Sequence, residues 1–333
     1  MKTGKMLALA AALLSVQVWA EAIKVGYISL PAHGANFIAK ERGYFAEQGL
    51  EAEMVRFQSA QQMAVAIASG DVDYGITSIT GGLLNLAARG DAVRIFGGSL
   101  MEDPSVEGQV ILASNQAYEE GLQSPKDLAG KRWAVTTAGS SFSYMGGQIA
   151  AAAGADAKSL KMIPFNGIPT ITAALSTGQV DAWSIQPAIA QRLIDKGEAK
   201  VIGKVADYLP DYQVTVLFTS TKNVQEKPNQ VKGFKTAYAR AIADYNKVLV
   251  DHQGEAAEID AVVAAVHKYV HSDEPLEKAR DLILQNNMKL SEGAALNRAD
   301  ALKQIEWFKA EGSVPANLEG EKILTPDAHE AAQ

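Results

Sequence analysis

Short apolar runs alternate with helical stretches along most of the chain. From residue 23 onward, each β-rich run ends in a loop that begins an amphipathic stretch. The predicted strands cover residues 23–29, 50–57, 73–77, 93–99, 132–137, 160–165 and 180–185. The predicted helices cover residues 36–46, 60–68, 82–89, 142–153 and 170–177, with a further one after Pro187. This order predicts an α/β fold in which helices cover a mostly parallel sheet.

The strand and helix pattern occurs twice. The segment 70–73 (GDVD) is echoed 108 positions later by 178–181 (GQVD). At the same offset residues 24–27 align with residues 132–135, and both segments are predicted strand starts. Two matches at one offset favour two lobes of similar build.

Two further β-rich segments, 109–113 and 213–220, lie on either side of the second unit. A lobe inserted into another must be entered once and left once, so these segments are predicted as hinge crossings about which the lobes swing. The predicted division is lobe I at 21–110 and 217–333, and lobe II at 111–216. After Pro228 the pattern is helical, and we expect this tail to pack on lobe I with helices at 231–250, 256–270, 276–285 and 295–310.

The first residues have the pattern of a secretory signal peptide. Lys2 and Lys5 precede an apolar stretch of about a dozen residues, which ends in the small-residue site at Ala20. This stretch is shorter than the roughly 20 residues that span a bilayer. We therefore expect residues 1–20 to be removed on export to the periplasm, leaving a protein that is not inserted in the membrane.

Composition narrows the choice of partners and cofactors. The formal net charge is −7, and an acidic chain without basic tracts argues against nucleic acid as a partner. The chain has no cysteine, which excludes a lipidation cysteine, a disulfide and a thiolate metal ligand. It also lacks the glycine-rich motifs of the P-loop and the dinucleotide-binding folds. We expect a monomer without a cofactor.

Candidate binding residues lie at the ends of predicted strands, where open α/β folds place their ligands. Ser78 and Thr80 belong to the first unit, and Ser140 and Ser141 to the second. Their hydroxyls and the free N–H groups of the following helices would form neutral donors, although helix capping explains any one of them alone. Phe142, Phe165 and Trp183 could wall an aromatic ring.

His33 lies in the loop after the first strand. It can contact a ligand there or cap the next helix, and both interpretations stay open. If it contacts an anion as the charged imidazolium, its contribution should grow at low pH, because its unperturbed pKa lies near 6.5.

Two patterns point to chemistry other than binding. The segment 139–143 (GSSFS) lies between a strand and a helix as a nucleophile elbow does, but Ser143 stands where that motif has glycine. A secreted serine hydrolase using Ser141 is thus an alternative of another class. His267 and His271 have the spacing of a helical metal pair, yet no third ligand is evident and a solvated helix face is favoured. We expect neither an enzyme nor a metal site.

Several segments together carry a family resemblance. Residues 25–27 and 37–50 resemble the opening of the nitrate, sulfonate and taurine group of solute-binding proteins. Further blocks of that group are similar, in the same order, to residues 69–73, 126–131, 178–183 and 307–315. The resemblance implies a type II periplasmic-binding-protein fold of two lobes, a cleft and two hinge crossings. It also implies delivery of the ligand to an ABC permease and its ATPase.

The resemblance also places the pocket loops, at 29–34, 78–80, 140–142 and 183–187. The candidate ligand-binding residues are Ser29, His33, Gly34, Ser78, Thr80, Ser140, Ser141, Phe142, Trp183 and Gln186. Taurine binders have an acidic residue in the first loop, and 29–34 contains none, so taurine is disfavoured.

The expected function is capture of a small organic anion, a sulfonate or a carboxylate, with aromatic acids included. The alternative ligands are nitrate and a precursor of the thiamine pyrimidine. Enzymes of the same superfamily that make this pyrimidine carry a cysteine-rich motif, which a chain without cysteine cannot have.

Overall fold

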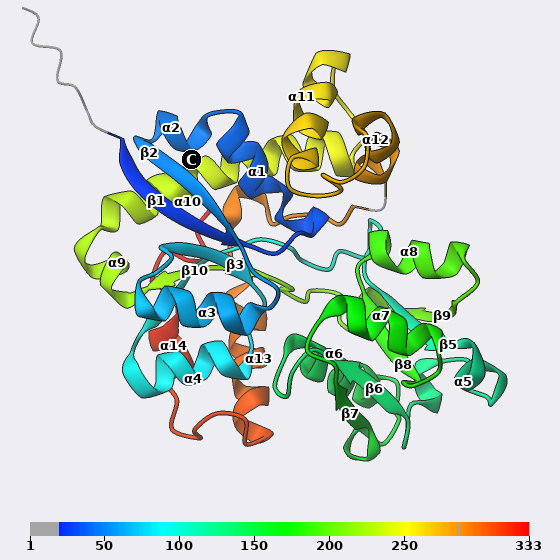
Figure 1. The fold of residues 1–333 in the computed structure, drawn as a ribbon. Coiled ribbons are helices and arrows are strands. Elements are labelled where there is room, and N and C mark those ends of the chain that lie inside the picture. Colours follow the sequence, from blue (N-terminus) through cyan, green and yellow to red (C-terminus); the bar gives the residue numbers. More distant parts are fainter. Residues whose placement is uncertain (1–19, 286, 333) are drawn as a thin grey trace, which may run out of the picture.

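A computed structural model describes residues 20–285 and 287–332 of the protein. The predicted signal peptide, residues 1–20, lies outside these residues except for Ala20. The described chain forms two five-stranded sheets with helices around each of them (Figure 1). The predicted α/β fold with two lobes is therefore confirmed. We call the unit built on the sheet that contains β1 lobe I and the other unit lobe II.

The sheet of lobe I has the strand order β2-β1-β3-β10-β4. Strand β1 (Glu21–Tyr27) pairs in parallel with β2 (Leu50–Arg56) and β3 (Tyr74–Thr77). Strand β10 (Val216–Ser220) is antiparallel and lies between β3 and β4 (Val93–Gly98). Lobe I thus takes one strand from a distant part of the sequence.

The sheet of lobe II repeats this order as β7-β6-β8-β5-β9. Its strands are β5 (Val110–Ser114), β6 (Arg132–Val135), β7 (Lys161–Pro164), β8 (Ala182–Ile185) and β9 (Ala199–Lys204). Strand β5, the first that the chain reaches here, is antiparallel to β8 and β9. Each sheet therefore contains one antiparallel strand at the same place in its order, which agrees with the repeat found in the sequence.

The two connections between the lobes run side by side. The N–H of Val214 donates to the carbonyl of Leu100 at 2.9 Å, and the N–H of Glu102 donates to the carbonyl of Tyr212 at 2.9 Å. The crossings, residues 99–109 and 205–215, are thus paired with each other at 99–102 and 212–215. Of the predicted crossings, residues 109 and 213–215 lie in these connections, whereas residues 110–113 and 216–220 belong to β5 and β10 within the two sheets.

Helices cover both sheets (Figure 1). Those of lobe II are α5 (Asn115–Glu119), α6 (Ser141–Ala152), α7 (Ile168–Ser176) and α8 (Pro187–Asp195). The remaining helices are α1 (Gly34–Glu41), α2 (Tyr44–Glu47), α3 (Ala60–Ser69), α4 (Gly81–Gly90), α9 (Thr221–Glu226), α10 (Pro228–Tyr245), α11 (Ala256–His267), α12 (Leu276–Leu284), α13 (Arg298–Ala310) and α14 (Gly320–Ile323). The single helix predicted over 36–46 is split into α1 and α2, because Gly43 has a left-handed φ of 78°.

Each lobe has its own buried aromatic side chains. In lobe I the Tyr74 ring of β3 stacks on Phe234 of α10 with ring centroids 4.2 Å apart. In lobe II Trp183 of β8 is completely buried in an apolar cluster that includes Ile171 and Leu175. The larger buried cluster joins Trp133, Tyr144 and Ile149 of lobe II to the core of lobe I, so the two lobes share part of their core.

We had expected the C-terminal tail to pack on lobe I. In the structure it contacts lobe II as well. Trp307 of α13 contacts Tyr144 of α6 edge to face, with ring centroids 5.3 Å apart. Gly147 permits this approach, because a Cβ atom there would lie 3.0 Å from the Trp307 ring. Helix α13 therefore touches both lobes beside the crossings.

The proposed helical pair of His267 and His271 does not exist. Helix α11 ends at His267, and His271 has a left-handed φ of 59° in the following turn. His267 Nε2 contacts the carbonyl of Glu274 at 2.8 Å. The two imidazoles do not share a helix face, so the spacing carries no metal-binding argument.

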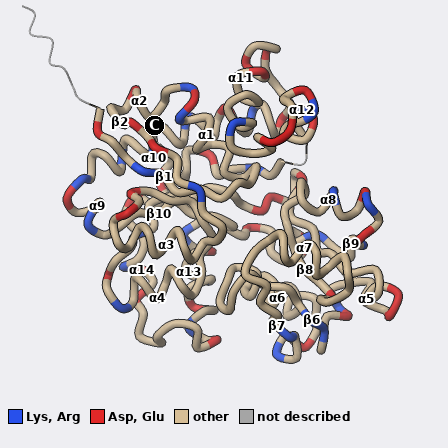
Figure 2. The backbone as a smooth tube through the Cα atoms, in the orientation of Figure 1, with Lys and Arg blue, Asp and Glu red and all other residues tan. Residues whose placement is uncertain are grey.

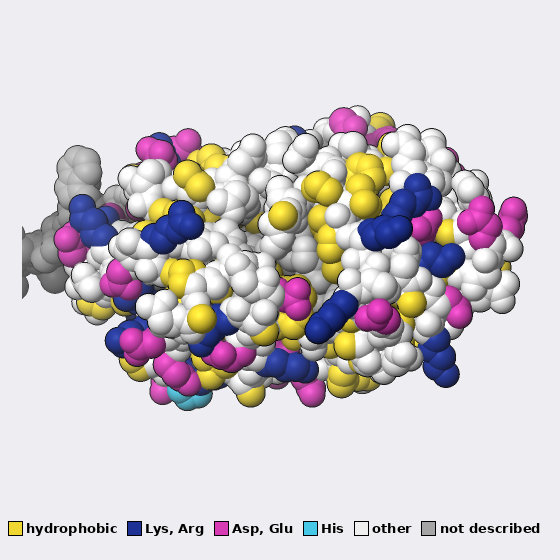
Figure 3. Space-filling view, turned by 90° about the horizontal axis from the view of Figure 1, so that it is seen from below, with side chains coloured by type: hydrophobic (Ala, Val, Ile, Leu, Met, Phe, Trp, Pro, Cys, Tyr) yellow, Lys and Arg dark blue, Asp and Glu magenta, His cyan; other side chains and the backbone are white. Residues whose placement is uncertain are grey.

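Acidic and basic side chains are spread over both lobes (Figure 2). The space-filling view from below shows the same mixture and a hollow between the lobes (Figure 3). No helix within residues 20–285 and 287–332 combines the length and the apolarity needed to cross a membrane.

Candidate ligand-binding site

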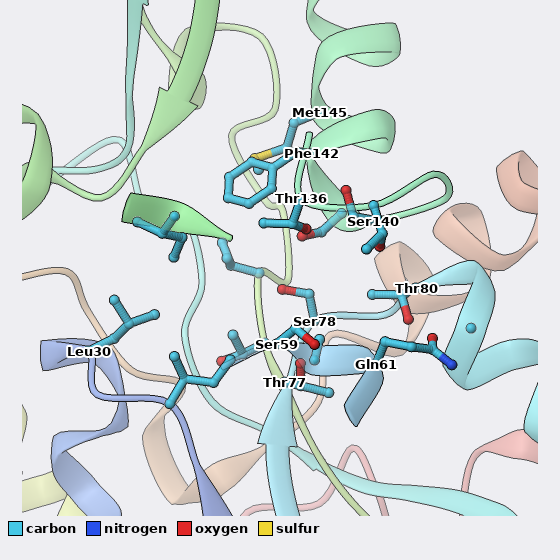
Figure 4. Close-up of a pocket in the computed structure, with 18 of the residues that line it drawn as sticks. Leu30, Ser59, Gln61, Thr77, Ser78, Thr80, Thr136, Ser140, Phe142 and Met145 are labelled. Carbon is cyan, nitrogen blue, oxygen red and sulfur yellow. The ribbon is translucent and has the colours of Figure 1, made fainter. Parts of the chain in front are cut away.

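A pocket lies between the lobes, at the carboxyl ends of strands from both sheets (Figure 4). We call it the inner pocket. Lobe I contributes the loops after β1, β2 and β3, and lobe II contributes those after β6 and β8. In the close-up, Ser59, Thr77 and Ser78 face Thr136 and Phe142 across the pocket. A ligand here would contact both lobes at once.

The polar lining of the inner pocket is neutral. Its hydroxyl and amide side chains are Gln58, Ser59, Gln61, Thr77, Ser78, Thr80, Gln109, Thr136, Thr137, Ser140, Ser141, Gln186 and Thr215. Among the residues that the structure describes, no Asp, Glu, Lys or Arg lines it. Any charge on a ligand would therefore meet neutral dipoles and helix N-termini.

Of the helices that begin at the pocket, α3, α4 and α6 are each preceded by a hydroxyl residue, and these three residues differ in one respect. Ser59 Oγ accepts from the N–H of Gln62 at 3.4 Å, and Thr80 Oγ1 accepts from the N–H of Leu83 at 3.1 Å. Ser140 holds the same position before α6, yet its side chain caps nothing. Helix capping thus explains why a hydroxyl residue stands at Thr80, but it does not explain the hydroxyl of Ser140.

Ser140 is one of two buried polar groups of the pocket that have no hydrogen-bond partner among the described residues, and His33 is the other. Its hydroxyl is buried and has no hydrogen-bond partner among the described residues. Gly139, with a left-handed φ of 71°, turns the chain sharply into α6 and places Ser140 at the pocket wall. Buried polar groups in native proteins are nearly always paired, so this hydroxyl is a strong candidate for contact with a ligand.

His33 lines the inner pocket but does not carry the charge that we had considered for it. The side chain is only 2% exposed, and burial lowers the pKa of His33 to about 4. Its Nδ1 atom has no partner among the described residues. At neutral pH the ring is therefore neutral, and an imidazolium contact with an anion does not fit this structure.

The buried state of His33 makes stability depend on pH. Between about pH 4 and 6.5 the unfolded chain binds a proton that the folded chain does not, so His33 lowers stability as pH falls through this window. The slope is at most about 1.4 kcal/mol per pH unit. Urea unfolding of wild type and His33→Gln at pH 7 and pH 4.5 should show a smaller loss on acidification in the variant. Equal losses would contradict this assignment.

Three predicted residues do not line the inner pocket. The Ser29 hydroxyl donates to the carbonyl of Tyr269 at 2.6 Å. Gly34 allows close packing, because a Cβ atom there would lie 2.8 Å from the Tyr245 ring. Trp183 is completely buried in the core of lobe II, with its ring 5.7 Å from that of Phe142. It supports the pocket wall from behind.

Sequence reasoning missed part of the lining. Gln58, Ser59 and Gln61 follow β2, and Thr136 and Thr137 follow β6, so the rule that had found Ser78 could have found them.

Two other missed residues, Gln109 and Thr215, lie at the crossings. Gln109 is held by the buried Glu102, whose Oε1 accepts from Gln109 Nε2 at 3.0 Å, and burial raises the pKa of Glu102 to about 7. No local sequence pattern identifies residues that reach a pocket from the crossings between two lobes.

A match to a family model decides the relationship. The model described as NMT1/THI5 like matches residues 30–248. The chain belongs to this NMT1/THI5-like family. The resemblance to the nitrate and sulfonate solute-binding proteins is thereby confirmed at the level of the family and the fold.

One curated relative is an enzyme, 4-amino-5-hydroxymethyl-2-methylpyrimidine phosphate synthase of Schizosaccharomyces pombe. The two are 33% identical over 102 residues, which are 31% of this chain. The chain covers only 27% of the length of this relative.

Solved structures share the fold over nearly the whole chain. The alkanesulfonate-binding protein SsuA from Xanthomonas axonopodis pv. citri, bound to MOPS, matches with a TM-score of 0.68 at 18% identity, covering 91% of this chain and 98% of that one. The periplasmic nitrate-binding protein NrtA from Synechocystis PCC 6803 matches with a TM-score of 0.70 at 14% identity, covering 92% and 86%. Identities this low establish the fold alone.

Proposed function

We propose that the protein is the monomeric, periplasmic substrate-binding component of an ABC importer. It captures a small organic anion, a sulfonate or carboxylate that includes aromatic acids, and delivers it to a permease and its ATPase. The observation that carries this proposal is the inner pocket, to which both lobes contribute hydroxyl groups, with Ser140 buried and unpartnered.

The pocket suits a small ligand with one flat or apolar part. Phe142, Met145 and Ile185 provide an apolar wall in lobe II, and Leu30 faces them from lobe I. The cavity volume is about 100 Å³, which limits the part of a ligand that it can enclose to a small group. A ligand that contacts both lobes would hold the lobes together while it is bound.

A precursor of the thiamine pyrimidine is the second candidate ligand. The family match and the partial similarity to the pyrimidine phosphate synthase favour it. The neutral lining also favours it, because the amides of Gln58, Gln61 and Gln186 can bond to ring nitrogen and amino groups. Nitrate as the ligand is supported only by the fold that the protein shares with the nitrate-binding protein NrtA.

The lining weighs against the hydrolase alternative. Ser141 would need a histidine base that a carboxylate orients. His33 is the histidine of the pocket, its pKa of about 4 makes it a weak base, and no carboxylate lines the pocket among the described residues. We therefore propose binding without turnover.

A thermal-shift screen tests the proposed function. The compounds are aromatic and aliphatic sulfonates and carboxylates, nitrate, and 4-amino-5-hydroxymethyl-2-methylpyrimidine. A ligand at 100 times its Kd stabilises the native state by about 2.7 kcal/mol, which raises the melting temperature by roughly 5 °C in a protein of this size. We expect at least one such shift, with the compound recovered unchanged. Shifts by none of them, or conversion of the compound, would contradict the proposal.

A further inference from the structure

A second cavity adjoins the inner pocket at the mouth of the cleft, and we call it the outer pocket. Ile28, Leu30, Gln58 and Ile168 line both cavities, so the two are neighbours along one cleft. The outer cavity volume is about 450 Å³, against about 100 Å³ for the inner one. A ligand too long for the inner pocket would extend into the outer one.

The outer pocket carries the charge that the inner pocket lacks. Arg56 enters it from the end of β2 in lobe I, and Arg192 and Lys196 enter it from α8 and its C-terminal end in lobe II. Among the described residues, its one lining carboxylate is Glu198, which accepts from the Ser176 hydroxyl at 3.0 Å. Three cations against one carboxylate make this site basic in a chain whose net charge is −7.

These cations form no ion pairs within the part of the chain that the structure describes. Arg56, Arg192 and Lys196 take part in none of the salt bridges formed by the residues that the structure describes. Their charge is thus available to an anion that enters the cleft.

Arg192 is held in place by a contact between the lobes. Its Nη2 atom lies 2.9 Å from His271 Nδ1 and 3.0 Å from His271 Nε2. Burial, and then the neighbouring Arg192, lower the pKa of His271, so the ring stays neutral beside the guanidinium. The tail segment after α11 thereby holds Arg192 at the outer pocket, which Arg56 also lines, on the side where α8 faces α12 (Figure 1).

We propose that the outer pocket binds the anionic end of an elongated ligand whose neutral end occupies the inner pocket. The anionic group is a sulfonate, a carboxylate or a phosphate, each of which accepts hydrogen bonds from guanidinium and ammonium groups. This inference rests on the proposed function, since it requires a ligand in the cleft. It places the charge of that ligand on Arg56, Arg192 and Lys196 rather than among the hydroxyls.

Matched pairs of probes separate the two ends of the ligand. One pair is 3-phenylpropane-1-sulfonate and 3-phenylpropan-1-ol, and the other is 4-amino-5-hydroxymethyl-2-methylpyrimidine and its phosphate. Each pair shares its neutral end and differs in the anionic group. Calorimetric titration of wild type should show roughly tenfold tighter binding of the anionic member of the pair that binds. Because the cations are exposed, 0.5 M salt should reduce this preference.

The double variant R56Q/K196Q tests the residues. Both side chains are exposed and unpaired among the described residues, so the fold should be unaffected. The control is R89Q/K158Q, which removes two equally exposed cations that line neither pocket. We expect R56Q/K196Q to bind the anionic member no more than about twofold tighter than the neutral one. The control should keep the preference.

The outcomes distinguish this inference from the proposed function. Equal affinity for both members in wild type, or a preference in R56Q/K196Q as large as in wild type, would overturn the outer anion site and leave cleft binding standing. Failure of all four probes to bind wild type would contradict the proposed function together with this inference. Loss of the preference in the control as well would also overturn the assignment, since it would show a general effect of surface charge.

Discussion

Replacing Ser140 by aspartate is expected to abolish ligand binding. The Ser140 side chain is buried at the start of α6, in a pocket where the described residues offer no cation. A carboxylate there would repel an anionic ligand and would occupy the donors of the helix N-terminus that a ligand would otherwise use. We expect calorimetric titration with the best compound of the screen to show an affinity loss of at least a hundredfold.

Two controls separate the charge from the change of residue. Ser140→Ala removes one neutral hydrogen bond and should cost about 0.5 to 1.5 kcal/mol, or up to tenfold in affinity. Asn317→Asp adds the same charge at an exposed loop position outside both pockets, and it should leave affinity unchanged. Full affinity in Ser140→Asp would mean that the ligand does not approach Ser140.

Replacing Trp183 by alanine is expected to destabilise lobe II by about 3 to 5 kcal/mol, which is typical of a deleted buried aromatic side chain. The Trp183 side chain is completely buried and packs in the apolar cluster of that lobe. Its removal would also withdraw support from Phe142, whose ring lies 5.7 Å away. Urea unfolding followed by circular dichroism measures the loss of stability, and titration measures the accompanying loss of affinity.

A conservative variant makes the Trp183 prediction specific. Trp183→Phe keeps a buried ring and should lose less than half as much stability as Trp183→Ala. If Trp183→Ala lost under 1 kcal/mol and bound ligand normally, the proposed support of the pocket wall would be contradicted.

Most strands and helices followed from the sequence, because each obeys a local pattern. The alternation of buried strand and amphipathic helix predicted the strand that ends just before Ser78 and the helix that begins just after Ser140, and both residues line the inner pocket. Strand β9 was missed because its segment Ala199–Lys204 has mixed, partly exposed residues typical of a sheet edge. The break at Gly43 was missed because glycine within a helical pattern does not by itself require a left-handed φ.

The unpredicted part of the site depends on contacts between distant segments. Gln109 and Thr215 reach the inner pocket because the two crossings run side by side, which no single segment encodes. Trp183 was assigned to the pocket from the position of its loop, whereas the strand turns its side chain into the lobe II core. The charge of His33 depends on burial, and burial follows from tertiary packing.

The crystal structure of the protein with the best compound of the screen tests the central claim most directly. We expect the compound to lie in the inner pocket between Ser78 of lobe I and Phe142 of lobe II, with a hydrogen bond from a polar group to Ser140 Oγ. A compound bound outside the cleft, or bound to one lobe only with the Ser140 hydroxyl still unpartnered, would contradict the account.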